Sequence, residues 1–93
     1  MINYHILVSG VVQGVGFRWS TYQLAKQLGL TGFVKNLPNG QVYIEAQGPS
    51  KNMHQLVRAL KDGSIAPYAR IEHYEVTPAN LSDYANFSIS TDW

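Results

Sequence analysis

The sequence predicts an α+β fold in which two helices cover one face of a mostly antiparallel sheet. Two observations indicate this class. Short stretches in which apolar residues alternate with polar ones are interleaved with two stretches of helical periodicity. Glycine and proline separate these stretches, and no repeat or low-complexity run lies between them. One domain is therefore expected over residues 1–93.

The first two elements are predicted to be a strand and a helix. A strand is expected over residues 4–9, where alternate residues are apolar. A helix is expected over about residues 17–28, because its apolar positions recur at helical spacing. Gly29 is placed to end this helix in a left-handed conformation. The strand face holds Tyr4, Ile6 and Val8, and the helical stripe holds Phe17, Thr21, Leu24, Ala25 and Leu28.

The middle of the chain predicts a hairpin. Strands are expected over residues 31–36 and 41–47, joined by a turn over residues 37–40. The Asn-Gly pair in this turn tolerates the positive φ that such a connection needs. One face of the second strand holds Val42, Ile44 and Ala46, and the other holds Tyr43, Glu45 and Gln47.

A second helix and two more strands complete the pattern. Ser50 is the expected N-cap of this helix, and Gly63 its expected end. Strands follow over about residues 70–76 and 86–90. The order is βαββαβ with one short strand appended at the C-terminus, which is the ferredoxin-like arrangement. The apolar stripe of this second helix consists of Met53, Leu56, Val57 and Leu60.

The composition excludes several classes of protein. Apolar residues make up 45% of the chain and charged residues 14%, whereas a disordered segment would be charge-rich and poor in apolar residues. No apolar run approaches the roughly 20 residues that span a bilayer, and the N-terminus does not resemble a signal peptide. The chain has no cysteine, which agrees with a reducing compartment. We therefore expect a cytoplasmic protein, and a monomer because few apolar runs are exposed.

The charges predict neither a nucleic-acid nor a membrane partner. Seven basic and six acidic residues give a formal net charge of +1, and the basic residues are dispersed along the chain. A nucleic-acid-binding protein usually carries a clear basic excess or stripe. The three histidines, His5, His54 and His73, are far apart in sequence, so we expect no metal site and no cofactor.

The most informative segment is the glycine-rich stretch between the first strand and the first helix. Gly10, Gly14 and Gly16 allow backbone N–H groups to turn toward one point, next to the positive end of the helix dipole. Such a loop is suited to bind an anion, most often phosphate. Arg18 lies in the first helical turn, where a cation is unfavourable unless an anion lies nearby. The residues alone leave open the alternative of a tight connection with a solvated arginine.

Two long motifs resemble the signatures of the acylphosphatase family. They are GVVQGVGFR over residues 10–18 and GFVKNLPNGQV over residues 32–42. The similarity continues at Gly48 and at residues 69–72 and 87–89, so it covers nearly the whole chain. The chain departs from the family at Phe33, where many members have Trp, at Asn39, where many have Asp, and at Thr91-Asp92-Trp93, for which we find no counterpart.

The resemblance implies hydrolysis of the carboxyl-phosphate bond of small acyl phosphates, with inorganic phosphate as a product. It implies that Arg18 binds the phosphoryl oxygens and that the side chain of Asn36 orients the attacking water. The leaving carboxylate has a conjugate acid with a pKa of about 4, so no general acid is needed. An amide such as Asn36 does not titrate and can place water only by hydrogen bonding. The backbone N–H groups implied in phosphate binding are those of Gln13, Gly14, Val15, Gly16, Phe17 and Arg18.

Two alternatives belong to other functional classes. An RNA-binding module of the same strand order would carry an aromatic-rich third strand that begins with a basic residue and glycine, and residues 41–46 lack this signature. A non-catalytic phosphate- or carbamoyl-phosphate-binding domain would share the glycine loop. The presence of both Arg18 and Asn36 favours the hydrolase. Without the resemblance, Asn36 would be interpreted as a residue that caps the turn after its strand.

Overall fold

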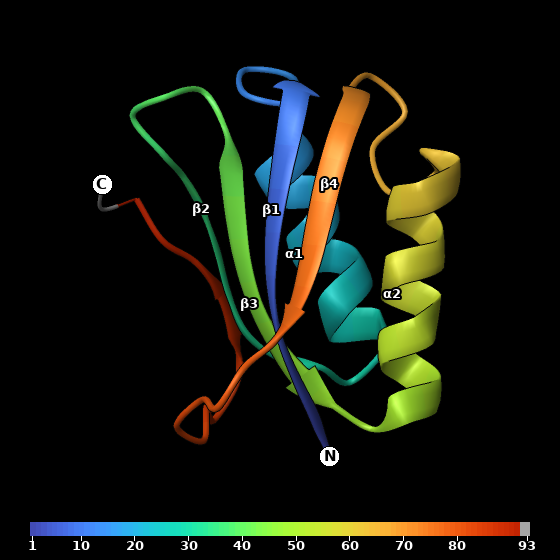
Figure 1. The fold of residues 1–93 in the computed structure, drawn as a ribbon, viewed down its shortest axis with the longest axis vertical. Helices are drawn as coiled ribbons and strands as arrows, with labels where there is room; N and C mark the ends of the chain where they lie inside the picture. The colour runs from blue at the N-terminus through green and yellow to red at the C-terminus, as the bar shows by residue number, and fades with distance from the viewer. Residues whose placement is uncertain (92–93) are drawn as a thin grey trace.

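Five strands form a single sheet in the order β4-β1-β3-β2-β5 in the computed structural model, which describes residues 1–91 (Figure 1). The last strand, β5, pairs parallel with β2, and every other pairing is antiparallel. The α+β class and the ferredoxin-like arrangement with a short fifth strand are thus confirmed. The strands are β1 (Ile2–Val11), β2 (Thr31–Asn36), β3 (Val42–Gly48), β4 (Arg70–Pro78) and β5 (Phe87–Ile89). Residues 92–93, part of the terminal segment without a counterpart, lie outside the described residues.

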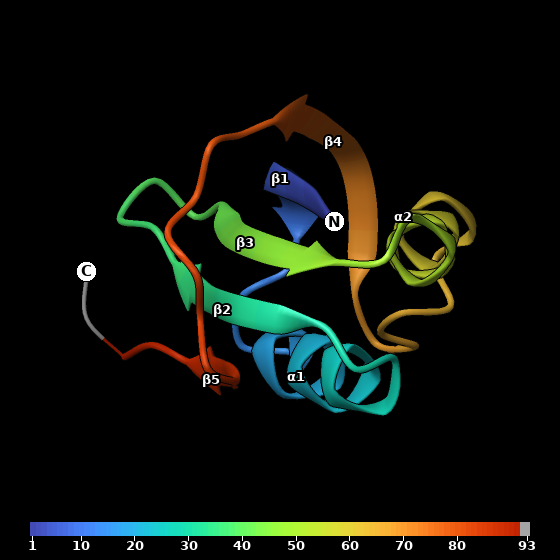
Figure 2. The ribbon, with the colours of Figure 1, turned by 90° about the horizontal axis from the view of Figure 1, so that it is seen from below.

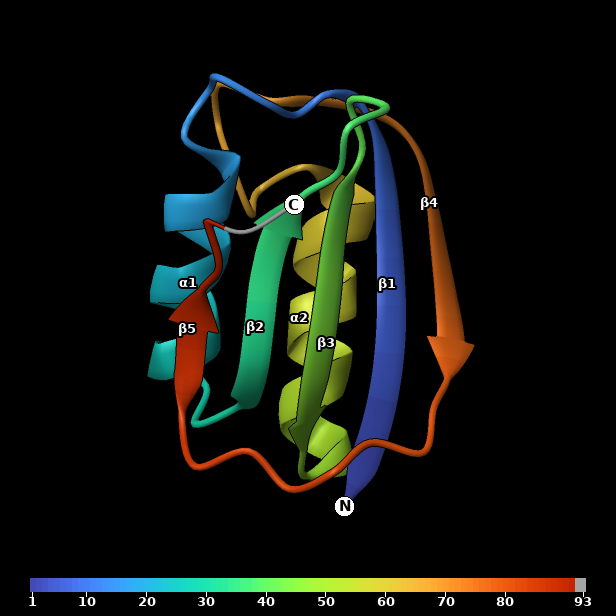
Figure 3. The ribbon, with the colours of Figure 1, turned by 90° about the vertical axis from the view of Figure 1, so that its left-hand side faces the viewer.

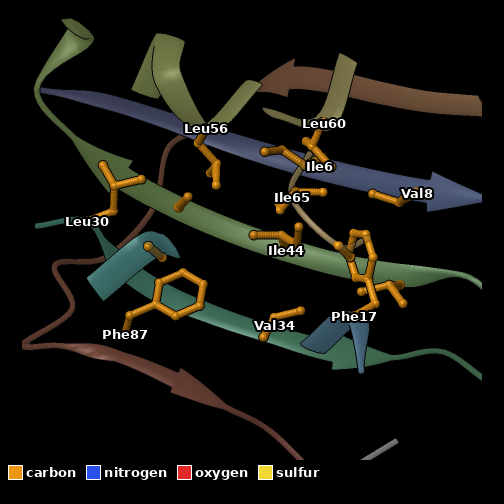
Figure 4. Close-up of a cluster of buried hydrophobic side chains, with 14 of the residues drawn as sticks. Ile6, Val8, Phe17, Leu30, Val34, Ile44, Leu56, Leu60, Ile65 and Phe87 are labelled. Atoms are coloured by element: carbon orange, nitrogen blue, oxygen red, sulfur yellow. The ribbon is translucent and has the colours of Figure 1, made fainter. Parts of the chain in front are cut away.

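The two helices, α1 (Phe17–Gln27) and α2 (Ser50–Asp62), cover the same face of the sheet (Figures 2 and 3). Their buried stripes meet the inward side chains of the strands in one hydrophobic core (Figure 4). The predicted strand faces are confirmed, because alternate residues of β1 and β3 are buried against the helices. Fully buried members include Ile6, Val8, Phe17, Val34, Ile44, Met53, Leu56 and Leu60.

The end of α1 is the one that the sequence predicts. Gly29 has a φ of 69°, and its N–H donates to the carbonyl of Lys26 at 3.1 Å. The N–H of Leu30 donates to the carbonyl of Ala25 at 2.9 Å, which completes the paired hydrogen bonds of a Schellman motif. Leu30 is therefore turned into the core, where it starts the approach to β2.

The start of α2 differs from the prediction. Ser50 is already helical, and Pro49 is the N-cap, with φ −61° and ψ 145°. The carbonyl of Pro49 accepts the hydrogen bond from the N–H of Met53 at 3.0 Å, and no side chain caps the helix. The proline ring fixes φ, which sets the extended conformation before the helix one residue earlier than expected. Gly63, with a φ of 80°, ends α2 as predicted.

The first strand extends further than predicted and takes up Gly10 and Val11. A register shift between Ser9 and Gly10 lets the strand continue beside β4. Gly10 has a φ of 128°, and a Cβ there would lie 2.1 Å from the carbonyl oxygen of Arg70. Only glycine fits this approach. The loop that precedes α1 is therefore shorter than the glycine-rich stretch.

The segment between β4 and β5 crosses below the sheet (Figure 3) and is tied to it by Gln47. This side chain is 2% exposed. Its Oε1 accepts from Thr31 Oγ1 at 3.1 Å and from the N–H of Tyr84 at 2.8 Å. Its Nε2 donates to Asn3 Oδ1 at 2.8 Å and to the carbonyl of Ser82 at 2.9 Å.

The sheet face without helices carries a hydrogen-bonded cluster around Glu45. The hydroxyls of Tyr43 and Tyr84 each donate to this carboxylate at 2.6 Å, and His5 Nε2 lies 3.6 Å from it. The tyrosines at 43, 68, 74 and 84 do not form one aromatic surface, because Tyr74 packs against the core and Tyr68 is an isolated, exposed loop residue.

Candidate active site

An open pocket of about 240 Å³ lies where the loop before α1 meets the end of β2 and β5. It brings Arg18 and Asn36 together, although they belong to different elements. The described residues that line it are Val12, Gly14, Gly16, Phe17, Arg18, Trp19, Asn36, Ile89 and Thr91.

The loop has the backbone geometry of an anion-binding turn. Gly14 and Gly16 have φ values of 77° and 79°, and no described residue other than glycine has a positive φ. The backbone therefore alternates in handedness along residues 14–17, which directs successive N–H groups toward the same side. The first helical hydrogen bond, from Ser20 N to Gly16 O, is 2.9 Å long. The N–H groups of Phe17 and Arg18 precede it, so they have no partner within the helix.

The charge around this pocket is positive. Arg18 is the one ionisable side chain among the described lining residues, and the first turn of α1 contains no acidic residue. The two ion pairs between described residues involve histidines with Glu45 and Glu75, which do not line the pocket. The Arg18 guanidinium is therefore available for two oxygens of an anion at the helix N-terminus.

Asn36 presents a buried acceptor at the opposite wall. It is the last residue of β2 and pairs with Val42 of β3. Its Oδ1 is buried and has no hydrogen-bond partner among residues 1–91. Most buried polar atoms in proteins are paired, so this one requires an explanation.

The interpretation of Asn36 as a turn cap is wrong for its Oδ1. The turn is instead closed by hydrogen bonds from Leu37 N to Gln41 O, at 2.8 Å, and from Gly40 N to Leu37 O, at 3.2 Å. Asn39 Oδ1, and not Asn36, accepts from a turn N–H, that of Gln41, at 3.0 Å.

The side chain of Gln13 joins the glycine loop to this turn. Its Nε2 donates to the carbonyls of Leu37 and Gln41, both at 2.9 Å. Gln41 Nε2 in turn donates to Ser9 Oγ at 2.8 Å, which ties the turn to the end of β1. The loop that precedes Arg18 and the residue that follows Asn36 are thus linked directly. The family resemblance implies a backbone role for Gln13, and the sequence contains no signal for this link, whose partners are 24 and 28 residues away.

Two further lining residues, Trp19 and Ile89, were not identified from the sequence. Trp19 follows Arg18 on α1, and Ile89 comes from β5, beside that helix (Figure 2). The position of Ile89 depends on the parallel pairing of β5 with β2, which the sequence pattern does not specify.

A separate hollow of about 410 Å³, between the end of α2 and β4, has a charge that is unsuited to an anion. Asp62 and Glu72 line it together with Lys61 and His73. Hydrogen bonds from the side chain and the backbone N–H of Ser64 lower the pKa of Asp62, so this carboxylate is charged at neutral pH.

The described residues contain no cluster of three or more histidine, aspartate or glutamate side chains that could hold a metal ion. Neither of the helices that the structure describes is long and apolar enough to cross a membrane.

The chain is similar to known acylphosphatases over nearly its whole length. The family model for acylphosphatase matches residues 4–89. An acylphosphatase from Archaeoglobus fulgidus is 43% identical over 90 residues, which cover 97% of this chain and 99% of that protein. One from Bacillus subtilis is 40% identical over 90 residues, which cover 96% of this chain and 97% of that protein.

Solved structures agree with this similarity. The crystal structure of the Bacillus subtilis acylphosphatase superposes with a TM-score of 0.89 at 38% identity, and the match covers 97% of this chain and 99% of that one. A full-length HypF in its phosphate- and nucleotide-bound form matches with a TM-score of 0.85 at 27% identity. That match covers 96% of this chain but 12% of the HypF chain.

Proposed function

The chain belongs to the acylphosphatase family and is an acyl-phosphate hydrolase, and we propose that Arg18 and the loop amides hold the phosphoryl group while Asn36 places the attacking water. One observation carries this division of roles. Glycines of the loop, Arg18 and Asn36 line a single pocket, and the buried Oδ1 of Asn36 has no partner among residues 1–91.

The phosphoryl group is bound by charge and by oriented backbone dipoles. In the proposed complex, the N–H groups of residues 13–18 donate to its non-bridging oxygens, and Arg18 donates two parallel hydrogen bonds to two of them. These donors are held in place before the substrate arrives by Gly14 and Gly16 and by the side chain of Gln13. Phosphoryl transfer depends mainly on positioning and on stabilising charge, which this arrangement supplies.

Asn36 acts on the water. Its Oδ1 accepts a hydrogen bond from a water molecule and aims the water's lone pair at phosphorus. A bond forms between the water oxygen and phosphorus while the bond from phosphorus to the acyl oxygen breaks. The electron pair of the breaking bond leaves with the carboxylate, which needs no proton because its conjugate acid has a pKa of about 4.

The proton of the water passes to the phosphate itself. The described lining residues include no histidine, aspartate or glutamate, and the guanidinium of Arg18 offers donors but no acceptor. A phosphoryl oxygen of the substrate is therefore the acceptor, and inorganic phosphate leaves with the proton. This assignment predicts a pH–rate profile without a side-chain base of pKa near 6.5. An essential base with that pKa would contradict it.

The mechanism is tested by hydrolysing acetyl phosphate in ¹⁸O-labelled water with EDTA present. We expect one ¹⁸O in each inorganic phosphate and none in acetate, because water attacks phosphorus and not the acyl carbon. Label in acetate would contradict the mechanism, and loss of turnover with EDTA would contradict its independence of metal.

Arg18→Ala is the variant that connects this reaction to the pocket. We expect its turnover to be nearly abolished, whereas Arg58→Ala, the same change on the exposed face of α2, retains wild-type turnover. If the folded wild type released no phosphate, a phosphate-binding domain without catalysis would become the better interpretation.

A further inference from the structure

Trp19 is an exposed aromatic side chain at the mouth of the candidate active site. It is 58% exposed, although it directly follows Arg18 and lines the same pocket as Asn36. The buried residues of α1 are Phe17, Thr21 and Ala25, and Trp19 is not among the residues that pack against the core. The helix therefore does not need Trp19 for its packing, and a large apolar surface is left in water.

The indole is supported on α1 by a neighbouring aromatic ring. Trp19 and Tyr22 are stacked, with ring centroids 5.5 Å apart and planes inclined by 28°. Lys26 Nζ lies 5.3 Å from the centroid of the Tyr22 ring and donates to its hydroxyl at 3.3 Å. These contacts restrict the orientation of the indole, so it forms a preorganised surface.

A second hollow, of about 400 Å³, continues from the pocket along the groove between α1 and β5. These two elements lie side by side (Figures 2 and 3). Trp19 and Ile89 line both cavities, so one apolar surface leads outward from the phosphate loop. The described lining of the second hollow contains no carboxylate, and its one cation, Lys26, lies over Tyr22.

The chemistry of an acyl phosphate places its acyl group against this surface. A single oxygen joins the acyl carbon to phosphorus, so the acyl group lies directly beside the phosphoryl site. Arg18 and the loop amides take the charged end of the substrate, which leaves the wall made by Trp19 and Ile89 for the uncharged end.

We propose that Trp19 and Ile89 form an acyl subsite that favours aromatic acyl groups over small aliphatic ones. This proposal rests on the proposed function. An aromatic ring stacks on an indole in an offset or edge-on geometry and removes apolar area from water on both partners. A methyl group covers much less of the indole. The enzyme therefore discriminates between acyl phosphates through Trp19, which follows Arg18 in the sequence.

The test compares benzoyl phosphate with acetyl phosphate in the wild type, Trp19→Ala, Trp19→Phe and the control Tyr68→Ala, which removes an exposed aromatic that lines neither cavity. We expect Trp19→Ala to lower kcat/KM about tenfold for benzoyl phosphate and no more than about twofold for acetyl phosphate. Trp19→Phe should retain most of the preference, and Tyr68→Ala should match the wild type. Inhibition by inorganic phosphate should stay unchanged, since phosphate does not reach the indole.

The proposal is overturned if Trp19→Ala lowers kcat/KM equally for both substrates, or for neither. Weaker inhibition by phosphate in this variant would also overturn it, because the indole would then act through the loop. A wild type that hydrolyses neither substrate would instead contradict the proposed reaction, so the two failures are distinguishable.

Discussion

Gln47 and Asn36 are two carboxamides at opposite ends of the same sheet, and their surroundings differ completely. Every polar atom of Gln47 is hydrogen-bonded, and its four partners come from β1, β2 and the segment after β4. The Oδ1 of Asn36 is equally buried and has no partner among the described residues. An unpaired buried acceptor costs roughly 1–3 kcal/mol of stability. A saturated amide thus stabilises the fold, whereas the unpaired Oδ1 of Asn36 is the acceptor to which we assign the attacking water.

Of the two amides, Asn36 is expected to have the larger effect on turnover. Asn36→Ala should lower kcat by about 100- to 1000-fold, the loss typical of removing one positioned hydrogen-bonding group from an active site. The free energy of unfolding should stay within about 1 kcal/mol of the wild type, because Oδ1 accepts no hydrogen bond that the variant would lose. Steady-state kinetics and urea unfolding measure the two quantities. Asn80→Ala, which alters an exposed asparagine, is the control and should change neither.

Gln47→Ala should give the opposite result. It leaves the partners of Gln47 unpaired, and we expect the free energy of unfolding to fall by about 3 kcal/mol. The kcat of the folded variant should stay within about twofold of the wild type, since Gln47 lies far from the pocket. Urea unfolding with Gln55→Ala as an exposed control checks the first expectation. A strong loss of kcat in the folded protein would break the contrast between the two amides.

Gln13→Met tests whether the loop and the turn must be held together. Methionine has a similar length but cannot donate to the carbonyls of Leu37 and Gln41. We expect kcat to fall about tenfold, because Asn36, proposed to place the water, and the loop proposed to bind the phosphate lose their fixed separation. Gln23→Met, an exposed change on α1, should have no effect on kcat. An unchanged kcat in Gln13→Met would show that the link has no part in positioning.

The smallest expected effect is on the pH dependence of stability. It involves Glu45, whose carboxylate accepts hydrogen bonds from Tyr43 and Tyr84. Its hydrogen bond with Tyr84, with a smaller contribution from burial, raises the pKa of that hydroxyl to about 12. Burial, followed by the hydrogen bond to Glu45, raises the pKa of Tyr43 as well. Both phenols keep their protons in the folded state at pH values where the unfolded chain, with an ordinary pKa of about 10, loses them. This contribution to stability is therefore complete below about pH 10 and is lost as the pH rises toward 12.

Urea unfolding between pH 9 and 11.5 measures this dependence. Tyr84→Phe should flatten the decrease in stability above pH 10, whereas Tyr68→Phe, which alters an exposed tyrosine, should not. An identical pH dependence in Tyr84→Phe and the wild type would contradict the assignment to this hydroxyl.

Local patterns in the sequence were sufficient to predict most of the fold. The helical stripes and the glycines at 29 and 63 identify where α1 and α2 lie and end. The N-terminus of α2 was wrongly placed at Ser50, because the fixed φ of Pro49 outweighed the capping preference of serine. The fixed φ of proline and the capping preference of serine both act over a few residues. Their competition explains why the expected start of α2 was wrong by one residue.

The site could be predicted as far as the glycine loop and the family motifs extend. The loop and Arg18 lie next to each other in sequence, and the family motif over residues 32–42 pointed to Asn36 as the second candidate residue. The link from Gln13 and the presence of Trp19 and Ile89 in one pocket depend on contacts between distant segments. The periodicity of a sequence does not indicate contacts between distant segments. These contacts can be identified only when the sheet order and the packing of β5 beside α1 are known.

Binding of inorganic phosphate tests the central division of roles most directly. Isothermal titration calorimetry should be performed on the wild type, Arg18→Ala and Asn36→Ala under one set of conditions. We predict that Asn36→Ala binds phosphate within about twofold of the wild type, and that Arg18→Ala binds it at least about 100-fold more weakly. Equal losses of phosphate affinity in the two variants would contradict the account, because Asn36 would then hold the phosphate and not the water.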